Sequence, residues 1–171
     1  MEHAVFGRPV DGASVFKATK GTKFGFYPHC PPNVVSSRPD ELFEMRPATP
    51  AQYFVRLIEW DAVSPSLNRF IGFTRLDGCF SIVTSQTWYE ARNATWSEIA
   101  EFLGGLGFVP VRADAYENAT TWHHPAQNLA LFDVGSSNLI WSAGHLVPID
   151  IIPVRPAGHM REILRQFVRA D

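Results

Sequence analysis

The chain has 171 residues, of which 46% are hydrophobic and 13% aromatic. That length allows one domain with a sizeable core, and thirteen Phe and five Trp exclude a disordered chain of low hydrophobicity. The formal net charge is −2, and no segment gathers the 15 Lys and Arg residues into the basic patch that nucleic-acid binding requires. We therefore expect a single soluble domain over residues 1–171 that binds no nucleic acid.

Cysteine content and hydropathy bear on the compartment. The two cysteines, Cys30 and Cys79, are too few for a disulfide framework, which favours a reduced, cytoplasmic environment. Charged residues interrupt the N-terminal segment from Arg8 onward, so no signal peptide is expected. No run approaches the roughly 18 consecutive apolar residues of a membrane span, and we expect no membrane partner.

The beginning of the chain is predicted to be rich in β-strands. Short apolar runs at 3–6 and 14–18 flank a segment rich in Gly and Pro, which predicts an N-terminal hairpin. A third strand is expected at 24–27. It should end at Pro28, because proline has no amide hydrogen to donate to a strand ladder. Residues 28–40 are then expected to form a loop.

Two helices carry clear start signals. Residues 49–52 combine a capping box with a proline at the first helical position, and the apolar spacing that follows predicts a helix to about residue 64. A second capping box at 95–98 opens a helix that runs through Leu106 and is closed by Gly107. A third helix is expected at 160–168.

Strands occupy the remaining apolar runs. Asp77-Gly78 joins two of them, which is a strong hairpin signal. The expected strands, all short and bounded by turn residues, are 70–74, 80–84, 129–132, 139–141 and 145–149. With the three helices, these strands predict an α+β fold.

Three residues with side-chain oxygen atoms form the candidate site. A strand at 129–132 leads to Asp133, and Asn138 ends the loop of small residues that follows. If the next hairpin turns at Gly144, Asn138 and Asp150 are equidistant from the turn and face each other, with Cβ atoms about 5 Å apart. Asp133 arrives at the same edge, and oxygen ligands suit a hard cation. The spacing therefore predicts a metal site at the mouth of this hairpin.

This arrangement is similar to the catalytic loop and metal-binding aspartate of protein kinases. Most of the chain resembles the atypical serine/threonine/tyrosine kinase-like domains of polyvalent proteins from phages and mobile elements. The most specific motifs are 133–138 and 147–150. The other matching positions are Val15 to Thr19, Gly21, Phe24-Gly25, Ala48 to Pro50, Tyr53, Arg56-Leu57, Ile82 to Gln86, Glu98-Ile99 and Leu106 to Phe108.

The resemblance implies a protein-kinase-like fold with a reduced N-terminal lobe at about 1–86 and a small C-terminal lobe at 87–171. The nucleotide is expected between the lobes. The resemblance also implies ATP and Mg²⁺ as cofactors. Asp133 would act on the acceptor hydroxyl as the catalytic residue, and Asn138 and Asp150 would hold the metal against the phosphates.

For the N-terminal lobe, the resemblance makes Lys17 the residue that contacts the nucleotide phosphates. Thr84, Ser85 and Gln86 lie where the hinge would meet adenine. Glu59, on the helix that starts at residue 49, is the expected ion-pair partner of Lys17. The charged alternatives nearby in the sequence are Lys20 and Lys23 for the lysine, and Glu41 and Glu44 for the acid.

The chain also departs from the typical kinase pattern. Phe132 replaces the Arg before the catalytic Asp, and Gly135 replaces a basic residue that commonly reaches the transferred phosphate. Ile151-Ile152 follows Asp150 in place of Phe-Gly, and the glycine-rich phosphate loop before Lys17 is missing.

Three functions remain open from these matches and departures. The leading one is ATP- and Mg²⁺-dependent phosphoryl transfer to a protein or small-molecule acceptor. The alternative is a catalytically silent pseudokinase that binds nucleotide or protein, and the third is a structural domain. The acceptor and the oligomeric state stay open.

Other kinds of site are disfavoured. His123 and His124 are adjacent in an expected strand and so point to opposite faces, which predicts one surface and one half-buried histidine in place of a zinc site. Cys30 and Cys79 have no companion cysteine at ligand spacing. The segment 135–137 lacks the G-x-S-x-G pattern of a serine hydrolase.

Overall fold

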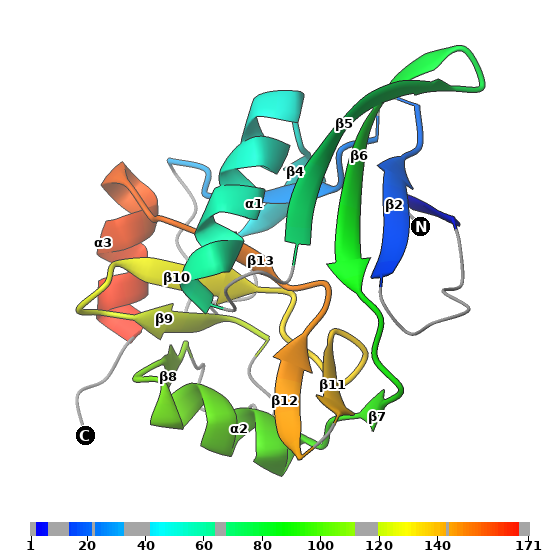
Figure 1. Ribbon diagram of the computed structural model, residues 1–171. Helices are drawn as coiled ribbons and strands as arrows, with labels where there is room; N and C mark the ends of the chain where they lie inside the picture. The colour runs from blue at the N-terminus through cyan, green and yellow to red at the C-terminus, as the bar shows by residue number, and fades with distance from the viewer. Residues whose placement is uncertain are drawn as a thin grey trace. The chain divides into compact units, whose positions relative to one another are not determined.

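The computed structural model describes residues 3–6, 14–21, 23–32, 42–63, 68–111, 120–142 and 144–167. Over these residues the chain is mixed α+β, as expected, and its strands pair antiparallel wherever their register is defined (Figure 1). Within the described ranges, no helix is both long enough and apolar enough to span a membrane.

The helices are α1 (Pro50–Val63), α2 (Trp96–Gly105) and α3 (Gly158–Phe167). The strands are β1 (His3–Phe6), β2 (Ser14–Thr19), β3 (Phe26–His29), β4 (Glu44–Pro47), β5 (Asn68–Leu76), β6 (Cys79–Thr87), β7 (Arg92–Asn93), β8 (Val109–Pro110), β9 (Trp122–His124), β10 (Leu129–Phe132), β11 (Leu139–Ser142), β12 (His145–Pro148) and β13 (Ile152–Val154).

The chain forms two compact units. Unit 1 comprises Met1–Tyr27 and Pro47–Glu90, and unit 2 comprises Pro28–Arg46 and Ala91–Asp171. The division at residue 90 lies close to the lobe boundary expected at residue 86. Residues 28–46, expected in the N-terminal lobe, belong instead to unit 2. That the two units act as one kinase-like domain stays a prediction.

Unit 1 is built on a four-stranded sheet with the order β1-β2-β6-β5. The expected N-terminal hairpin is confirmed by the pairing of β1 with β2, while its turn at 7–13 lies outside the described residues. The hairpin at Asp77-Gly78 is also confirmed. Both turn residues have positive φ, 51° and 77°, as a two-residue hairpin turn requires. Its strands extend beyond the expected 70–74 and 80–84 on both sides.

Helix α1 begins as the sequence predicted. The Gln52 amide donates to Thr49 Oγ1 at 3.3 Å, and Gln52 Oε1 accepts from the Thr49 amide at 2.9 Å. The apolar face of α1 and the sheet share one core, in which the buried residues are Phe24, Ala48, Tyr53 and Ile82. The end expected near residue 64 agrees with the observed end at Val63.

Strand β3 corrects the prediction that a strand stops at Pro28. β3 continues through Pro28 to His29 and pairs with β4, a strand that the sequence did not predict. Proline is compatible with this position, because both strands of a two-stranded sheet are edge strands. Of the loop expected at 28–40, residues 33–40 lie outside the described part of the chain.

Unit 2 contains two small sheets, ordered β13-β10-β9-β8 and β12-β11-β7. All four residues of β10 are buried, which explains its uninterrupted apolar sequence. The largest fully buried side chains of this unit come from helices, strands and loops alike: Ile99, Leu103, His123, Leu129, Leu131, Val134, Leu139, Ile151, Val154 and Leu164. The short strands β7, β8, β9 and β13 were not predicted.

Helices α2 and α3 complete unit 2. The capping box of α2 is present, because Thr95 Oγ1 accepts from the Glu98 amide while the Glu98 carboxylate accepts from the Thr95 amide. Gly107, with φ of 87°, follows the helix as expected. α3 begins at Gly158, two residues before the expected start, and residue 168 lies outside the described residues.

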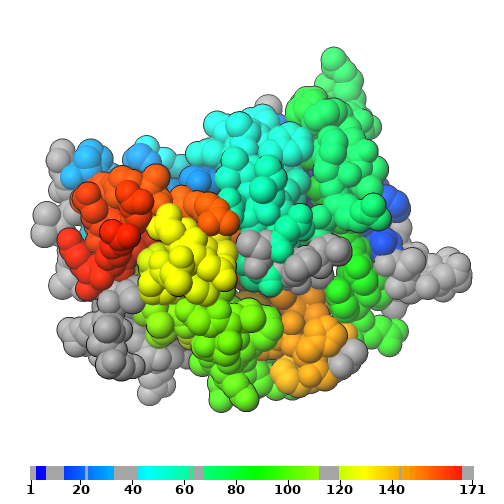
Figure 2. Space-filling view, turned by 60° about the vertical axis from the view of Figure 1, so that its left-hand side comes forward, coloured from blue at the N-terminus to red at the C-terminus, as the bar shows by residue number. Residues whose placement is uncertain are grey.

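The turn between β9 and β10 is tied to the segment that leads into α3. Asn128 Nδ2 donates to the Pro156 carbonyl at 3.0 Å, and Arg155 Nη1 donates to the Gln127 carbonyl at 2.9 Å. Figure 2 shows this junction from outside, with the yellow atoms of the turn beside the orange and red atoms that lead into α3. These two hydrogen bonds therefore hold the start of β10, the strand that precedes Asp133.

Candidate functional site

Asp133 stands at the end of β10 in a strained backbone conformation. Its φ of 56° lies in the left-handed region, which costs a non-glycine residue about 1 kcal/mol. Its two neighbours anchor it, since Phe132 and Val134 are 3% and 1% exposed. The Val134 amide also donates to the Thr120 carbonyl at 3.0 Å. With both neighbours buried, Asp133 itself is exposed at the end of the strand.

Asn138 closes the loop that begins at Asp133. Its side-chain Nδ2 donates to the Asp133 carbonyl oxygen at 2.7 Å. The backbone amides of Asn138 and Leu139 both donate to the Gly135 carbonyl, at 2.9 and 3.0 Å. Because a carbonyl accepts only from Nδ2, this bond fixes the orientation of the carboxamide and makes Oδ1 the atom that is able to ligate a cation.

Asp150 is joined to the same loop through the backbone. The amides of Ile149 and Asp150 donate to the Asn138 carbonyl at 2.8 and 3.4 Å. The expected register is wrong by one residue: Leu139 pairs with Pro148, so Asn138 lies opposite Ile149 and not opposite Asp150. The physical reason is the turn, because Ser142 pairs with His145 and the hairpin is centred between residues 143 and 144.

Asp133, Asn138 and Asp150 are therefore linked in series within unit 2. Their side chains offer carboxylate and amide oxygen atoms, the donors that Mg²⁺ prefers. Among the described residues, no group of three or more His, Cys, Asp or Glu side chains is close enough to hold a metal ion. A metal here would thus need the Asn138 amide oxygen and phosphate oxygens as ligands. Convergence of the two carboxylates stays a prediction.

Lys17 and the 84–86 segment come together in unit 1. In the ladder between β2 and β6, Lys17 pairs with Thr84, Phe16 with Ser85 and Val15 with Gln86. Paired residues share a face of the sheet, and neighbouring residues alternate between faces. Lys17, Thr84 and Gln86 therefore lie on one face and Ser85 on the other. The side chains of the three predicted hinge residues therefore cannot all face one ligand, although the three residues are buried and consecutive in β6.

The face of the sheet that carries Lys17 is the face covered by α1. His3 lies two residues from Val5, which pairs with Lys17, so both histidine and lysine are on this face. The His3 ring hydrogen-bonds the hydroxyl of Tyr53 on α1 at 3.1 Å. Sheet register and helix contact thus put Lys17 and α1 on the same side.

The predicted partner of Lys17 is Glu59, which lies on α1 and is half-buried. Burial of the phenol raises the pKa of Tyr27, and the charge of Glu59 adds a smaller effect in the same direction. The alternative Glu44 lies in β4 and bonds Arg46 at 2.8 Å. Glu41 lies outside the described residues. The pairing of Lys17 with Glu59 stays a prediction.

The other lysines near Lys17 lie at the end of the strand. Lys20 and Lys23 face each other in a single bridge, in which the Lys23 amide donates to the Lys20 carbonyl at 3.0 Å, and both residues are exposed. Lys17 is instead half-buried within β2 and paired with β6. The role of Lys17 as the phosphate contact stays a prediction.

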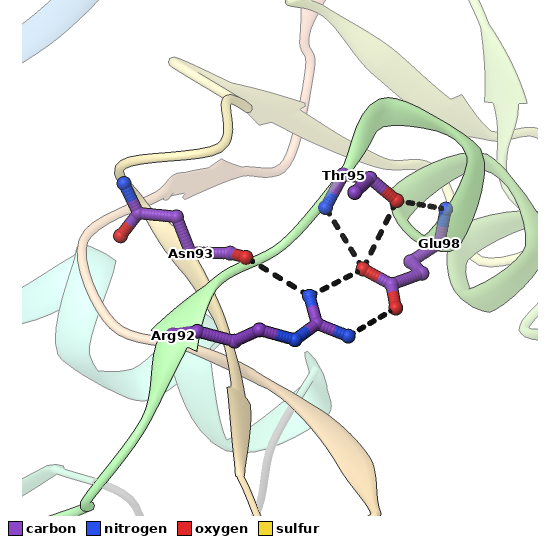
Figure 3. Close-up of polar contacts among 4 residues, drawn as sticks. All are labelled: Arg92, Asn93, Thr95 and Glu98. Carbon is purple, nitrogen blue, oxygen red and sulfur yellow. Dashed lines mark hydrogen bonds and ion pairs between the residues drawn. The ribbon is translucent and has the colours of Figure 1, made fainter.

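Arg92 supports the hairpin that follows Asn138, a role that no sequence motif indicated. Arg92 pairs with Trp141 across β7 and β11, and its guanidinium lies 5.4 Å from the centre of the Trp141 ring. Its Nη1 and Nη2 atoms donate to both carboxylate oxygens of Glu98, which also caps α2 at Thr95 (Figure 3). The hydrogen bonds from Arg92 and Thr95 lower the pKa of Glu98 to about 2. β11 and α2 are thereby joined.

The histidine and cysteine residues form no metal site among the described residues. His123 is buried, 1% exposed, where a surface or half-buried side chain was expected, and His124 is half-buried. Burial lowers the pKa of His123, with smaller effects of Arg165 and His124. Cys30 and Cys79 are both free thiols.

Comparison of the chain with protein-family models, with curated proteins and with solved structures found no significant match. The grounds for a function are therefore the geometry of the two units and the motifs of the sequence.

Proposed function

We propose that the protein is an ATP- and Mg²⁺-dependent phosphotransferase of the atypical kinase type. The observation that carries this proposal is the hydrogen-bonded series of Asp133, Asn138 and Asp150. The Asn138 side chain bonds the Asp133 carbonyl, and the Asn138 carbonyl accepts from the Asp150 amide. The resemblance to kinases rests on the same three residues at the same spacing.

Each residue has a distinct role in this proposal. Asp133 is exposed and held by buried neighbours, which suits a group that accepts the proton of an acceptor hydroxyl or orients it. Asn138 Oδ1 and the Asp150 carboxylate are the proposed ligands of a Mg²⁺ ion that bridges the phosphates. Because the roles differ, loss of the Asp133 carboxylate should impair phosphoryl transfer, whereas loss of the Asp150 carboxylate should impair Mg²⁺-dependent nucleotide binding.

The arrangement of unit 1 also supports the proposal. Along the chain, β2 with Lys17 precedes helix α1, with β3 and β4 between them, and the β5–β6 hairpin follows α1; β2 pairs directly with β6. The same face of that sheet carries Lys17 and faces α1, the helix of Glu59. This is the order of elements that the expected reduced N-terminal lobe requires.

A catalytically silent pseudokinase is the second candidate, and two residues favour it. Phe132 packs its ring in the core where a kinase presents Arg, and Gly135 supplies no charge to the transferred phosphate. A preorganised charge at such a position is worth about 10²–10³ in rate. A Cβ at Gly135 would meet nothing within 4 Å, and the Gly135 φ is not positive. Gly135 is therefore a position where the missing charge can be restored.

The test is phosphoryl transfer from radiolabelled ATP to the protein itself and to generic acceptors. Wild type, Asp133→Ala, Gly135→Lys and Glu101→Ala are compared, the last removing an exposed carboxylate of α2 as a control. An enzyme shows label in wild type and Glu101→Ala, more label in Gly135→Lys, and loss of transfer but not of nucleotide binding in Asp133→Ala. Background label in every protein, Gly135→Lys included, supports the pseudokinase.

A further inference from the structure

Phe132, the residue before Asp133, is in contact with Phe43, an aromatic residue from a distant part of the sequence. The Phe43 ring meets the Phe132 ring edge to face, with centroids 5.1 Å apart and planes at 75°. Phe43 belongs to the segment 28–46, which lies in unit 2 although the chain before and after it lies in unit 1. Its neighbour Leu42 is buried, 3% exposed, and fixes this end of the segment.

Phe132 depends on this contact because it is the last residue of its strand. β10 pairs with β9 only as far as Leu131, which faces Trp122. On the other side the ladder reaches Phe132, which pairs with Ile152 of β13. One edge of Phe132 therefore lies beyond the β9 ladder, and its ring is held by packing. Phe43 supplies an aromatic partner for that ring.

The position of Asp133 follows from that of Phe132. Asp133 has φ of 56°, and a strained backbone of this kind persists only where its surroundings fix it. On the C-terminal side, buried Val134 and the Asn138 carboxamide provide that support. On the N-terminal side, the support is the buried ring of Phe132 and the residues that pack against it.

We propose that Phe43 is a positioning residue, whose ring holds Phe132 and thereby keeps Asp133 aimed at the acceptor hydroxyl. This inference rests on the proposed phosphotransferase function. Phe43 packs against Phe132, which stands where the typical kinase has Arg before its catalytic Asp, so packing within the chain orders the catalytic loop. Asn138 and Asp150 flank the β11–β12 hairpin, whose ladder does not include Phe43, so loss of this ring should affect nucleotide binding less than phosphoryl transfer.

A shift of Asp133 is expected to affect the rate more than the affinity for ATP. Misplacing a catalytic group by about 1 Å can lower the rate about 10²-fold. Phe43→Ala should therefore lower kcat by about 10- to 100-fold while the KM for ATP changes less than about twofold. Phe43→Tyr keeps the ring and should restore most of kcat.

The experiment compares the full-length wild type with Phe43→Ala, Phe43→Leu, Phe43→Tyr and Phe102→Ala. Phe102 is half-buried on α2 and serves as the control for a general loss of packing. Phe43→Leu keeps apolar volume, so the comparison survives if Phe43→Ala does not fold. Two quantities are measured on each protein: kcat and KM for ATP, and hydrogen exchange of the peptide that covers residues 132–139.

The proposal predicts faster exchange at 132–139 and lower kcat in Phe43→Ala and Phe43→Leu, near-normal values in Phe43→Tyr, and neither effect in Phe102→Ala. Equal kcat in Phe43→Ala, Phe43→Leu and Phe102→Ala overturns it. If the wild type transfers no phosphate, the proposed function fails on its own. Exchange then still decides whether Phe43 orders the loop: unchanged protection of 132–139 in Phe43→Leu and Phe43→Ala rejects that role.

Discussion

Burial of His3 makes unit 1 sensitive to mild acid. The ring is 8% exposed, and its Nε2 atom lies 3.1 Å from the Tyr53 hydroxyl. Burial, followed by the positive charges of Lys17 and Arg56, lowers the pKa of His3 from 6.5 to about 3. The native state therefore favours the neutral ring, whereas the unfolded chain takes up a proton below pH 6.5.

The sign and size of the effect follow from this difference. Stability from His3 is complete above pH 6.5 and is lost as the pH falls from 6.5 towards 3, because only the unfolded state binds the extra proton. The free energy of unfolding then falls by about 1.4 kcal/mol per pH unit within that window. Between pH 7 and pH 5 the loss from this one residue is about 2 kcal/mol.

Urea unfolding of unit 1 at pH 7, 6 and 5 measures this loss, with wild type, His3→Gln and Tyr53→Phe compared. His3→Gln should be less sensitive to acid than wild type by about 2 kcal/mol over the two pH units, because Gln does not titrate. Tyr53→Phe removes the hydrogen-bond partner but keeps the imidazole, so it should retain most of the pH dependence. Identical pH dependence in wild type and His3→Gln would refute the reasoning.

Three further predictions concern unit 2. Replacing His123 by Leu should stabilise the protein increasingly as pH falls below 6.5, because burial lowers the pKa of His123 and neither ring nitrogen has a hydrogen-bond partner among the described residues; equal urea midpoints at pH 5 would contradict this. Arg92→Ala should move the pKa of Glu98 up from about 2, since the hydrogen bond from Arg92 is the largest cause of its lowering, as carboxyl NMR titration will show. Thr95→Ala removes the α2 cap and should lower the free energy of unfolding by about 1 kcal/mol in urea melts.

Elements with strong local signals were predictable from the sequence. Helix α2 has its cap at Thr95, its terminator at Gly107 and its apolar spacing all within one short segment. The hairpin at Asp77-Gly78 is similar, because two residues able to adopt positive φ define the turn by themselves. In both cases the residues that specify the structure are neighbours in the sequence.

Elements that depend on distant residues were missed. β7 contains only Arg92 and Asn93, and it is a strand because β11 pairs with it. β4 pairs with β3, a partner that no local pattern in residues 44–47 indicates. Strands this short show no alternation of polar and apolar residues, so periodicity gives no signal for them.

The candidate site shows the same division. The sequence motif predicted that Asp133, Asn138 and Asp150 belong together, and hydrogen bonds link Asn138 to Asp133 and Asp150 to Asn138. The predicted register of the hairpin was wrong by one residue. The prediction centred the turn on Gly144, whereas the observed pairing of Ser142 with His145 moves the centre of the hairpin half a residue towards the N-terminus. Phe43 gave no signal, since its contact with Phe132 joins segments that only the fold brings together.

Ligand-induced stabilisation is the direct test of whether Asn138 and Asp150 hold a metal against nucleotide phosphates. Thermal unfolding is measured at millimolar ATP, with Mg²⁺ and with EDTA, for wild type, Asp150→Ala and the control Glu101→Ala. At ten times Kd, a ligand that binds only the native state adds about 1.4 kcal/mol. For a chain of this length that raises Tm by about 3 to 6 °C.

We expect this rise for wild type and Glu101→Ala with Mg²⁺, and little or none for Asp150→Ala or in EDTA. An unchanged Tm of the wild type at millimolar ATP and Mg²⁺, or an equal rise in Asp150→Ala, would contradict it.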